Sequence, residues 1–226
     1  MGANMGNRDR DSRACTRPLF YDPEIHHRRS IRLPGYDYSQ AGAYFVTLCT
    51  QGRTPLFGGI VDGTMRLNEV GTMVQSVWQS MPDRFPSVII DVYVIMPNHF
   101  HAIVIIDETV GATLVVAQAD VATSEGAEPG PALADVAQNG SGTTPGLGNI
   151  VGAFKSITTV EYISGVRTLG WQPFERRIWQ RNYWEHIIRN EESYARIADY
   201  IVNNPANWKT DQLYPDATPN PFNRNT

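Results

Sequence analysis

VIIDVYVIM-PN-HFHAIVII, residues 88–106, is the stretch of this 226-residue sequence that decides its fold. Two runs rich in β-branched and aromatic residues lie on either side of Pro97-Asn98, and only Asp91 interrupts the first run. Apolar runs bounded by turn-forming residues are typical of buried strands. We therefore expect two central antiparallel strands joined by a short turn.

The segments around this stretch alternate between strand and helix patterns. In chain order they are a strand over 44–49, a hairpin turn at Asp62-Gly63, a helix from Asn68 to Pro82, the two central strands, a helix from Asn149, and a helix from Asn190 to about Asn203. The expected helices rest on apolar residues at helical spacing and on favourable capping residues. This order predicts an α+β fold rather than repeated βαβ units.

Composition divides the chain into one expected domain and three segments without periodicity. The apolar content of 42% is sufficient for a single core. Polar residues dominate 1–20, small residues and prolines dominate 109–146, and prolines recur in 209–226. We expect two disordered tails and a disordered insertion there. The expected catalytic domain covers 21–208, interrupted by the insertion.

The charge and the cysteine content limit which partners and which cellular compartment the sequence is compatible with. A net charge of −4 argues against a nucleic-acid partner, but six acidic residues and no Lys or Arg lie between 107 and 148, so the remaining chain carries +2. No run is long enough to span a membrane and no leader is visible, which favours a cytoplasmic protein with no membrane partner. Cys15 and Cys49 form neither a disulfide framework nor a C-x-x-C metal motif.

His99 and His101 are the first residues with a chemical signature. Alternate residues of a strand face the same side, so both imidazoles share one face, which continues with Ile103 and Ile105. The pair therefore lies at the end of its strand, beside the Pro97-Asn98 break. Two imidazoles are an incomplete metal site, since a third donor is usually needed. An ordinary hydrogen-bonded pair of histidines remains the alternative.

Tyr200 and Asn204 lie one turn apart on the last expected helix, so the phenol and the carboxamide emerge on the same side. A tyrosine is a poor nucleophile near neutral pH because its pKa is about 10, and it needs a nearby base or cation. Pro205 is expected to end the helix at Asn204. A half-buried tyrosine and a helix-capping asparagine remain the alternative.

Four segments together resemble a known family. VIMPNHFH (94–101) is similar to the HUH motif of single-tyrosine transposases. WQRNYWEHIIRN (179–190) and DYIVNNP (199–205) resemble the C-terminal half of REP-associated tyrosine transposases, and GAYFVT (42–47) resembles their first strand. The similarity covers about 36–208, excepting the insertion.

This resemblance implies a ferredoxin-like antiparallel sheet with helices packed on it, the HUH nuclease fold. It also implies that His99, His101 and Asn204 bind a divalent metal, Mg²⁺ or Mn²⁺, and that Tyr200 is the catalytic nucleophile. The implied activity is cleavage and strand transfer of single-stranded or hairpin DNA, in palindromic repeats, through a 5′-phosphotyrosine intermediate. Such a reaction serves DNA transposition.

The sequence gives weaker evidence for individual DNA contacts, and it leaves alternative functions open. We expect phosphate contacts from five basic residues near an aromatic cluster, although such residues often only solvate a surface: Lys155, Arg176, Arg177, Arg181 and Arg189. Two rival functions stay open. One is a hairpin-DNA-binding regulator without strand transfer, and the other is a metal-dependent phosphodiesterase in which His99 and His101 activate water. Both a monomer and a homodimer are compatible with the sequence.

Overall fold

The computed structural model describes residues 32–107 and 145–217. The chain divides into two compact units, Met1–Leu33 and Pro34–Thr226, and every element below belongs to the second. The expected tail over 1–20 lies outside the described residues, and so does the expected insertion over 109–146 except for its last two residues. Residues 209–217 of the expected C-terminal tail are described, and 218–226 are not.

Strands and helices alternate along the described chain. Their order is β1 (Gly42–Cys49), η1 (Gln51–Arg53), β2 (Gly58–Val61), β3 (Thr64–Leu67), α1 (Glu69–Gln79), α2 (Met81–Arg84), β4 (Val88–Ile95), β5 (His99–Ile106), α4 (Leu147–Thr168), β6 (Trp184–Ile188), α5 (Glu191–Asn203) and η2 (Trp208–Thr210). Within the described ranges, no helix combines the length and the apolar character that crossing a membrane requires.

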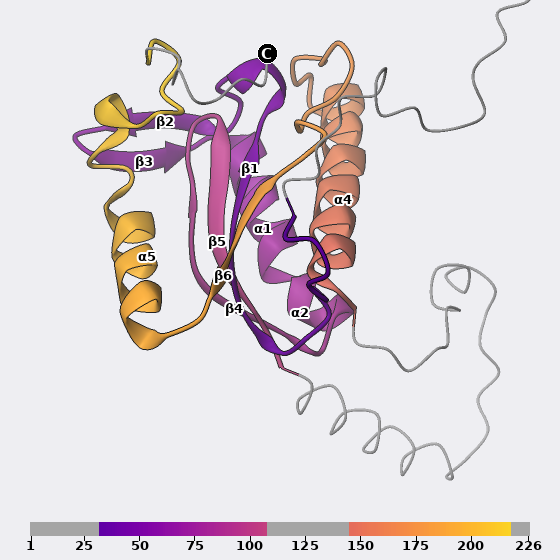
Figure 1. Cartoon of the computed structure of the whole chain (residues 1–226). Coiled ribbons are helices and arrows are strands. Elements are labelled where there is room, and N and C mark those ends of the chain that lie inside the picture. The colour runs from indigo at the N-terminus through magenta and orange to yellow at the C-terminus, as the bar shows by residue number, and fades with distance from the viewer. Residues whose placement is uncertain (1–31, 108–144, 218–226) are drawn as a thin grey trace, which may run out of the picture. The chain divides into compact units, whose positions relative to one another are not determined.

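Four strands form one antiparallel sheet in the order β4-β5-β1-β6 (Figure 1). Both β1 and β4 are antiparallel to β5, so they run parallel to each other on its two sides. Along the chain, the four strands of this sheet and the two main helices between them follow the order strand, helix, strand, strand, helix, strand. Together with the order of the strands in the sheet, this is the ferredoxin-like, split β-α-β arrangement. The expected α+β fold and the antiparallel pairing of the two strands in 88–106 are confirmed. Only β5 is central, however, because β4 lies at the edge of the sheet and β1 takes the second central position.

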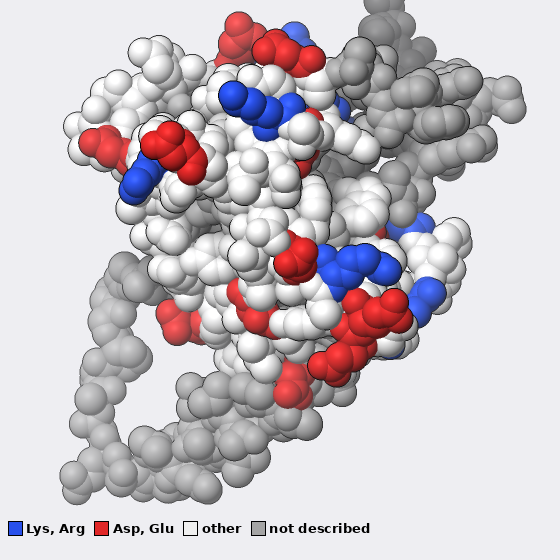
Figure 2. Space-filling view, turned by 90° about the vertical axis from the view of Figure 1, so that its left-hand side faces the viewer, with Lys and Arg blue, Asp and Glu red and all other residues white. Residues whose placement is uncertain are grey.

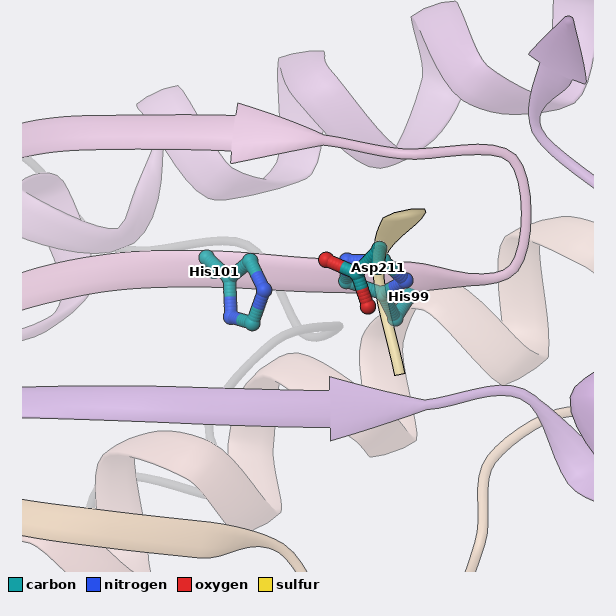
Figure 3. A group of neighbouring side chains, drawn as sticks. All are labelled: His99, His101 and Asp211. Atoms are coloured by element: carbon teal, nitrogen blue, oxygen red, sulfur yellow. The ribbon is translucent and has the colours of Figure 1, made fainter. Parts of the chain in front are cut away.

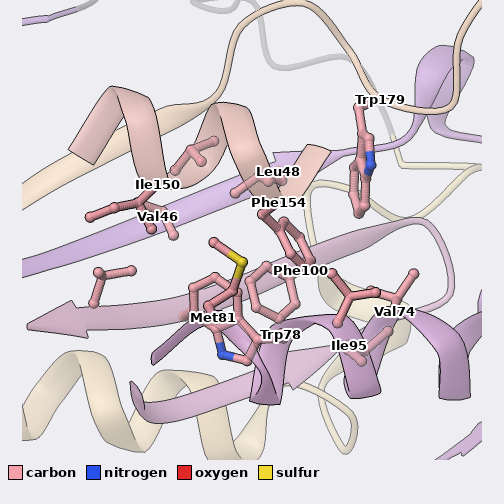
Figure 4. Close-up of a cluster of buried hydrophobic side chains, with 14 of the residues drawn as sticks. Val46, Leu48, Val74, Trp78, Met81, Ile95, Phe100, Ile150, Phe154 and Trp179 are labelled. Carbon is pink, nitrogen blue, oxygen red and sulfur yellow. The ribbon is translucent and has the colours of Figure 1, made fainter. Parts of the chain in front are cut away.

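One face of the sheet packs against α1 and α4 and forms the main core (Figures 1 and 4). Trp78 of α1, Phe100 of β5 and Phe154 of α4 meet there, with ring centroids 4.8 Å, 5.1 Å and 5.3 Å apart. Each of these aromatic side chains removes a large area from water, of the order of 150–250 Å². The core therefore holds β5 firmly in the middle of the sheet.

The opposite face of the sheet packs against α5 (Figure 1). Phe45 of β1, Ile103 of β5 and Ile201 of α5 form the centre of this smaller core. The hydroxyl group of Tyr194 on α5 donates a hydrogen bond to the carboxylate of Asp91 on β4. Since α5 packs over the face that carries the odd-numbered residues of β5, its C-terminal end comes to the two histidines.

Local sequence signals are confirmed where the structure describes them. The side chain of Asn68 accepts a hydrogen bond from the backbone N–H of Gly71 at the start of α1. Asp62 and Gly63 have φ angles of 50° and 70°, as the tight turn between β2 and β3 requires. The helix expected from Asn149 begins two residues earlier, at Leu147, because that side chain is itself fully buried.

Candidate active site

His99 and His101 lie at the start of β5 on the α5 face, and their imidazole rings are adjacent (Figure 3). They are 0% and 2% exposed, and their ring centroids are 4.5 Å apart. The strand register places Thr47 opposite His101, and its hydroxyl oxygen lies 2.8 Å from His101 Nδ1. The shared face predicted from the strand pattern is therefore confirmed.

Asn98 fixes the ring orientation of His99. Its amide nitrogen donates to the backbone carbonyls of Arg53 and Leu213, at 3.1 Å and 2.8 Å. Its Oδ1 atom is thereby the acceptor that lies 2.8 Å from His99 Nδ1. His99 therefore carries its proton on Nδ1 and keeps a free lone pair on Nε2.

Burial keeps both imidazoles neutral. Desolvation lowers the pKa of His99 to about 4, although the carboxylate of Asp211 works in the opposite direction. Desolvation also lowers the pKa of His101 well below its ordinary value, and the neighbouring His99 adds to this effect. A neutral imidazole is the form that binds a metal ion, so the site is prepared to accept a cation rather than a proton.

The C-terminal end of α5 brings Tyr200 and Asn204 to this pair. Tyr200 is 44% exposed, and its hydroxyl oxygen lies 3.2 Å from His101 Nε2. Asn204 is 2% exposed, occupies the C-cap position, and its backbone N–H bonds the carbonyl of Ile201. The phenol thus faces solvent on one side and the histidines on the other, whereas the carboxamide is enclosed.

Asp211 is a site residue that the sequence reasoning missed. One of its carboxylate oxygens lies within 4.8 Å of ligand atoms of both His99 and His101 (Figure 3). The same carboxylate accepts a hydrogen bond from Asn204 Nδ2 at 3.0 Å and lies 3.4 Å from the Tyr200 hydroxyl. Asp211 is a single acidic residue in a proline-containing segment and belongs to no motif. Neither the spacing of residues nor their periodicity therefore indicates a functional role for it.

Residues 209–217, which we assigned to a C-terminal tail, are anchored beside the site. Asn98 donates to the carbonyl of Leu213, and Arg53 donates to the carbonyl of Gln212 at 3.2 Å. The backbone N–H of Leu213 also donates to the Asp211 carboxylate at 2.6 Å. These bonds hold the carboxylate toward the histidines.

The donor set fits a divalent cation. His99 Nε2 and Asn204 Oδ1 are both buried and have no hydrogen-bond partner among the residues that the structure describes. Leaving such atoms unpaired costs about 1–3 kcal/mol each, which a bound cation would offset. Two imidazole nitrogens and two side-chain oxygen groups, with Asp211 supplying the negative charge, suit first-row divalent ions and Mg²⁺.

Tyr200 is not activated by the protein groups alone. Burial raises its pKa to about 12, and the negative charge of Asp211 acts in the same direction. The hydrogen bond from Asn204 opposes these effects but does not outweigh them. A positive charge beside the phenol is therefore needed before it can react as a phenolate near neutral pH.

Lys155, one of the five expected DNA-contacting residues, makes hydrogen bonds within the fold. Its ammonium group donates to the carbonyl of Gln180 at 2.9 Å, and it lies 3.3 Å from that of Asn182. Burial lowers its pKa to about 8. In this structure Lys155 fastens the segment that leads into β6.

The four arginines are exposed, but they lie at different ends of the sheet. Arg181 precedes Trp184, whose position opposite Thr47 is close to the histidines. Arg176 and Arg177 precede Ile178, whose carbonyl bonds Gln51 just beyond the end of β1. Arg189 follows the other end of β6, about 16 Å along the strand from Trp184.

Figure 2 shows the side of the molecule on which α5 lies. Uncharged side chains cover most of this side, and acidic and basic side chains are scattered among them. The described residues in this view form no continuous basic patch. Any nucleic acid held here would thus depend on the site itself and on single arginines more than on a broad positive surface.

Comparison with known proteins identifies relatives of the chain. No family model matches it. It is 42% identical over 197 residues to an uncharacterized protein of Haemophilus influenzae, which covers 87% of this chain and 98% of that protein. The chain therefore belongs to the same family as this Haemophilus influenzae protein.

A second relative is similar over a short segment. A "putative REP-associated tyrosine transposase" of Haemophilus influenzae is 52% identical over 31 residues, which are 14% of this chain and 18% of that protein. A solved structure of a REP-associated tyrosine transposase bound to a REP hairpin aligns with a TM-score of 0.46 and 18% identity, over 82% of this chain and 77% of that one. The 31-residue match supports, over that segment, the resemblance to REP-associated tyrosine transposases noted in the sequence.

Proposed function

We propose that this chain is a transposase-like enzyme that cleaves and rejoins single-stranded or hairpin DNA with Tyr200 as the nucleophile. The observation that carries the proposal is a half-exposed phenol beside two buried, neutral histidines, with the unpaired His99 Nε2, the unpaired Asn204 Oδ1 and the Asp211 carboxylate grouped so that they fit a cation. The motif resemblance and the 31-residue similarity to a transposase support DNA as the substrate.

His99, His101 and Asn204 are the proposed ligands of Mg²⁺ or Mn²⁺, and Asp211 joins them as a fourth. A cation bound there would supply positive charge that stabilises the phenolate of Tyr200 and the oxygens of the scissile phosphate. Asn98 and Thr47 orient the two imidazoles from behind. Such fixed outer partners keep the ligand atoms aimed at one point.

Tyr200 attacks the phosphorus atom of the scissile phosphate. The bond between its phenolic oxygen and phosphorus forms as the bond from phosphorus to the 3′-oxygen breaks. The phenolic proton leaves to water at the exposed side of the ring, and the departing 3′-oxygen takes up a proton. The products are a 5′-phosphotyrosine and a free 3′-hydroxyl, and the 3′-hydroxyl of a second strand can reverse the step without ATP.

Formation of a covalent adduct tests this proposal. The full chain is incubated with labelled single-stranded hairpin oligonucleotides and Mn²⁺ or Mg²⁺, and the products are separated by denaturing electrophoresis. We expect a protein-linked band that is lost in Tyr200→Phe and with EDTA. Tyr93→Phe is the matched control, because that phenol lies on the opposite face of the sheet, in contact with the main core.

Each of the other outcomes points to a different function. An adduct that persists in Tyr200→Phe would exclude Tyr200 as the nucleophile. Hairpin binding without an adduct under any metal condition would favour the regulator without strand transfer. Cleavage that proceeds in Tyr200→Phe without an adduct, but not in His99→Gln, would favour the metal-dependent phosphodiesterase.

A further inference from the structure

Trp184, the first residue of β6, is unusual among the tryptophans because its indole ring is 50% exposed. Trp78, Trp179 and Trp208 are buried in contrast. A single exposed apolar side chain needs no explanation by itself. Its neighbours, however, connect this indole to the candidate active site.

Phe45 joins Trp184 to the nucleophile. Its ring lies between that of Trp184, with centroids 5.5 Å apart, and that of Tyr200, at 6.1 Å. The same ring lies 5.3 Å from His101. The β6 to β1 register also places Trp184 directly opposite Thr47, which holds His101. One aromatic ring therefore separates the exposed indole from both the phenol and a proposed metal ligand.

His186 extends the aromatic surface along β6. Residues 184 and 186 lie on the same face of the strand, and their ring planes are 5° from parallel with centroids 6.0 Å apart. His186 is exposed as well. Two exposed aromatic rings, stacked on each other, therefore lie beside the site.

The segment before Trp184 is held in place. Lys155 binds the carbonyls of Gln180 and Asn182, and five residues of β6 pair with β1. The indole is therefore presented by an anchored strand end rather than by a free loop. Arg181, three residues earlier in the same segment, is exposed and adds a positive charge to it.

We propose that Trp184 is a stacking platform for one unpaired nucleobase beside the phosphate that Tyr200 attacks, with His186 extending the platform. This inference rests on the proposed function and specifies its substrate as a strand that is single-stranded at the cleavage site. A base in a duplex has its faces covered by neighbouring bases, so an aromatic side chain binds unpaired bases preferentially. Stacking is tolerant of base identity, so Trp184 contributes affinity and position rather than sequence recognition.

Abasic scanning tests the platform. Binding is measured by fluorescence anisotropy in the Tyr200→Phe background, which prevents cleavage, on the hairpin with single-stranded flanks and on copies with one base removed at each flank position. When Trp184 is present, we expect one flank position at which removal of the base weakens DNA binding about tenfold, a loss that corresponds to one stacking contact. Trp184→Ala should weaken binding to the intact strand by a similar factor and abolish the further effect of removing that base.

Two variants serve as controls. Trp184→Phe keeps an aromatic face and should retain most of the affinity, which separates stacking from a general loss of structure. Leu169→Ala removes another exposed apolar side chain, at the C-cap of α4, and should not change binding.

The outcomes separate the two proposals. If base removal weakens DNA binding by the Trp184→Ala variant as much as it weakens binding by the protein with Trp184, the stacking inference is overturned. Adduct formation by the wild-type chain would still support the proposed function in that case. If the protein binds no hairpin and forms no adduct, both are overturned.

Discussion

The carboxyl group of Asp211 lies among His99, His101 and Asn204, although it belongs to none of the motifs that led to those residues. Asp211→Asn keeps an oxygen acceptor for the N–H of Leu213 but removes the negative charge. We expect Mn²⁺ affinity to fall about tenfold or more, since even outer-shell changes at metal sites cost about 10–100-fold. Isothermal titration of the full chain measures this.

Asp216→Asn is the control for this change, because Asp216 is exposed on the same segment. It should bind Mn²⁺ as the wild-type chain does. Equal Mn²⁺ affinity in the two variants would exclude Asp211 as a metal ligand.

The two buried histidines predict a loss of stability in acid. Their pKa values lie below the value of about 6.5 expected in the unfolded chain, with that of His99 at about 4. Between about pH 6.5 and 4 the unfolded chain therefore binds more protons, so the free energy of unfolding falls as the pH drops through this window. His99 alone accounts for about 2 kcal/mol at pH 5. Urea unfolding in EDTA at pH 7 and pH 5 measures the loss.

Replacement of both histidines separates their effect from that of the carboxylates. A His99→Gln, His101→Gln double variant should lose less stability between pH 7 and pH 5 than the wild-type chain does. The same loss in the wild-type chain and in the double variant would contradict neutral, buried imidazoles.

At the scale of elements, α5 is the part that brings Tyr200, the proposed nucleophile, to the sheet, and the bond from Tyr194 to Asp91 holds it against β4. Tyr194→Phe should lower the free energy of unfolding by about 1 kcal/mol and speed amide hydrogen exchange in α5. The bond to Asp91, followed by burial, raises the pKa of Tyr194 to about 12. The contribution of its hydroxyl is therefore complete below about pH 10 and is lost as the pH rises from 10 to 12.

A double-mutant cycle with Asp91→Ala isolates this contact. The effects of Tyr194→Phe and Asp91→Ala should be clearly non-additive at pH 7, because each removes the same hydrogen bond. Additive effects would show that α5 is held by its apolar stripe alone.

Elements also show where prediction from sequence succeeds. The helix predicted from Asn190 to about Asn203, the cap at Asn68 and the turn at Asp62-Gly63 depend on residues within one or two turns of each other, and all are present. The contacts of Lys155, in contrast, were not predicted from the sequence. Its ammonium group binds carbonyls about 25 residues away in the sequence, a contact that periodicity does not encode.

At the scale of the whole molecule, the segment after η2 returns to the start of β5. Deletion after Thr210 removes Asp211 and the carbonyl of Leu213 that Asn98 binds, whereas deletion after Ala217 leaves both. We expect both shortened chains to fold, because no residue between Trp208 and Ala217, where the described chain ends, belongs to the buried cores. Mn²⁺ affinity should fall only in the shorter one.

Thermal unfolding and Mn²⁺ titration of the two shortened chains, beside the full chain, measure this. Equal Mn²⁺ affinity after both deletions would mean that the segment after η2 covers the site without contributing to it. Unfolding of the chain that ends at Thr210 would instead assign residues 211–217 to the stability of the fold.

The sequence by itself determined the parts of the site that lie on one element. His99 and His101 share a face because strand side chains alternate, and Tyr200 and Asn204 emerge together because a helix repeats every 3.6 residues. Tertiary structure alone decided what surrounds them: the carboxylate of Asp211, the Thr47 and Asn98 bonds that orient the imidazoles, and the distance of Arg189 from the site. The physical reason is that backbone geometry fixes local spacing, whereas contacts between distant segments depend on how the buried side chains of the whole sheet and its helices pack.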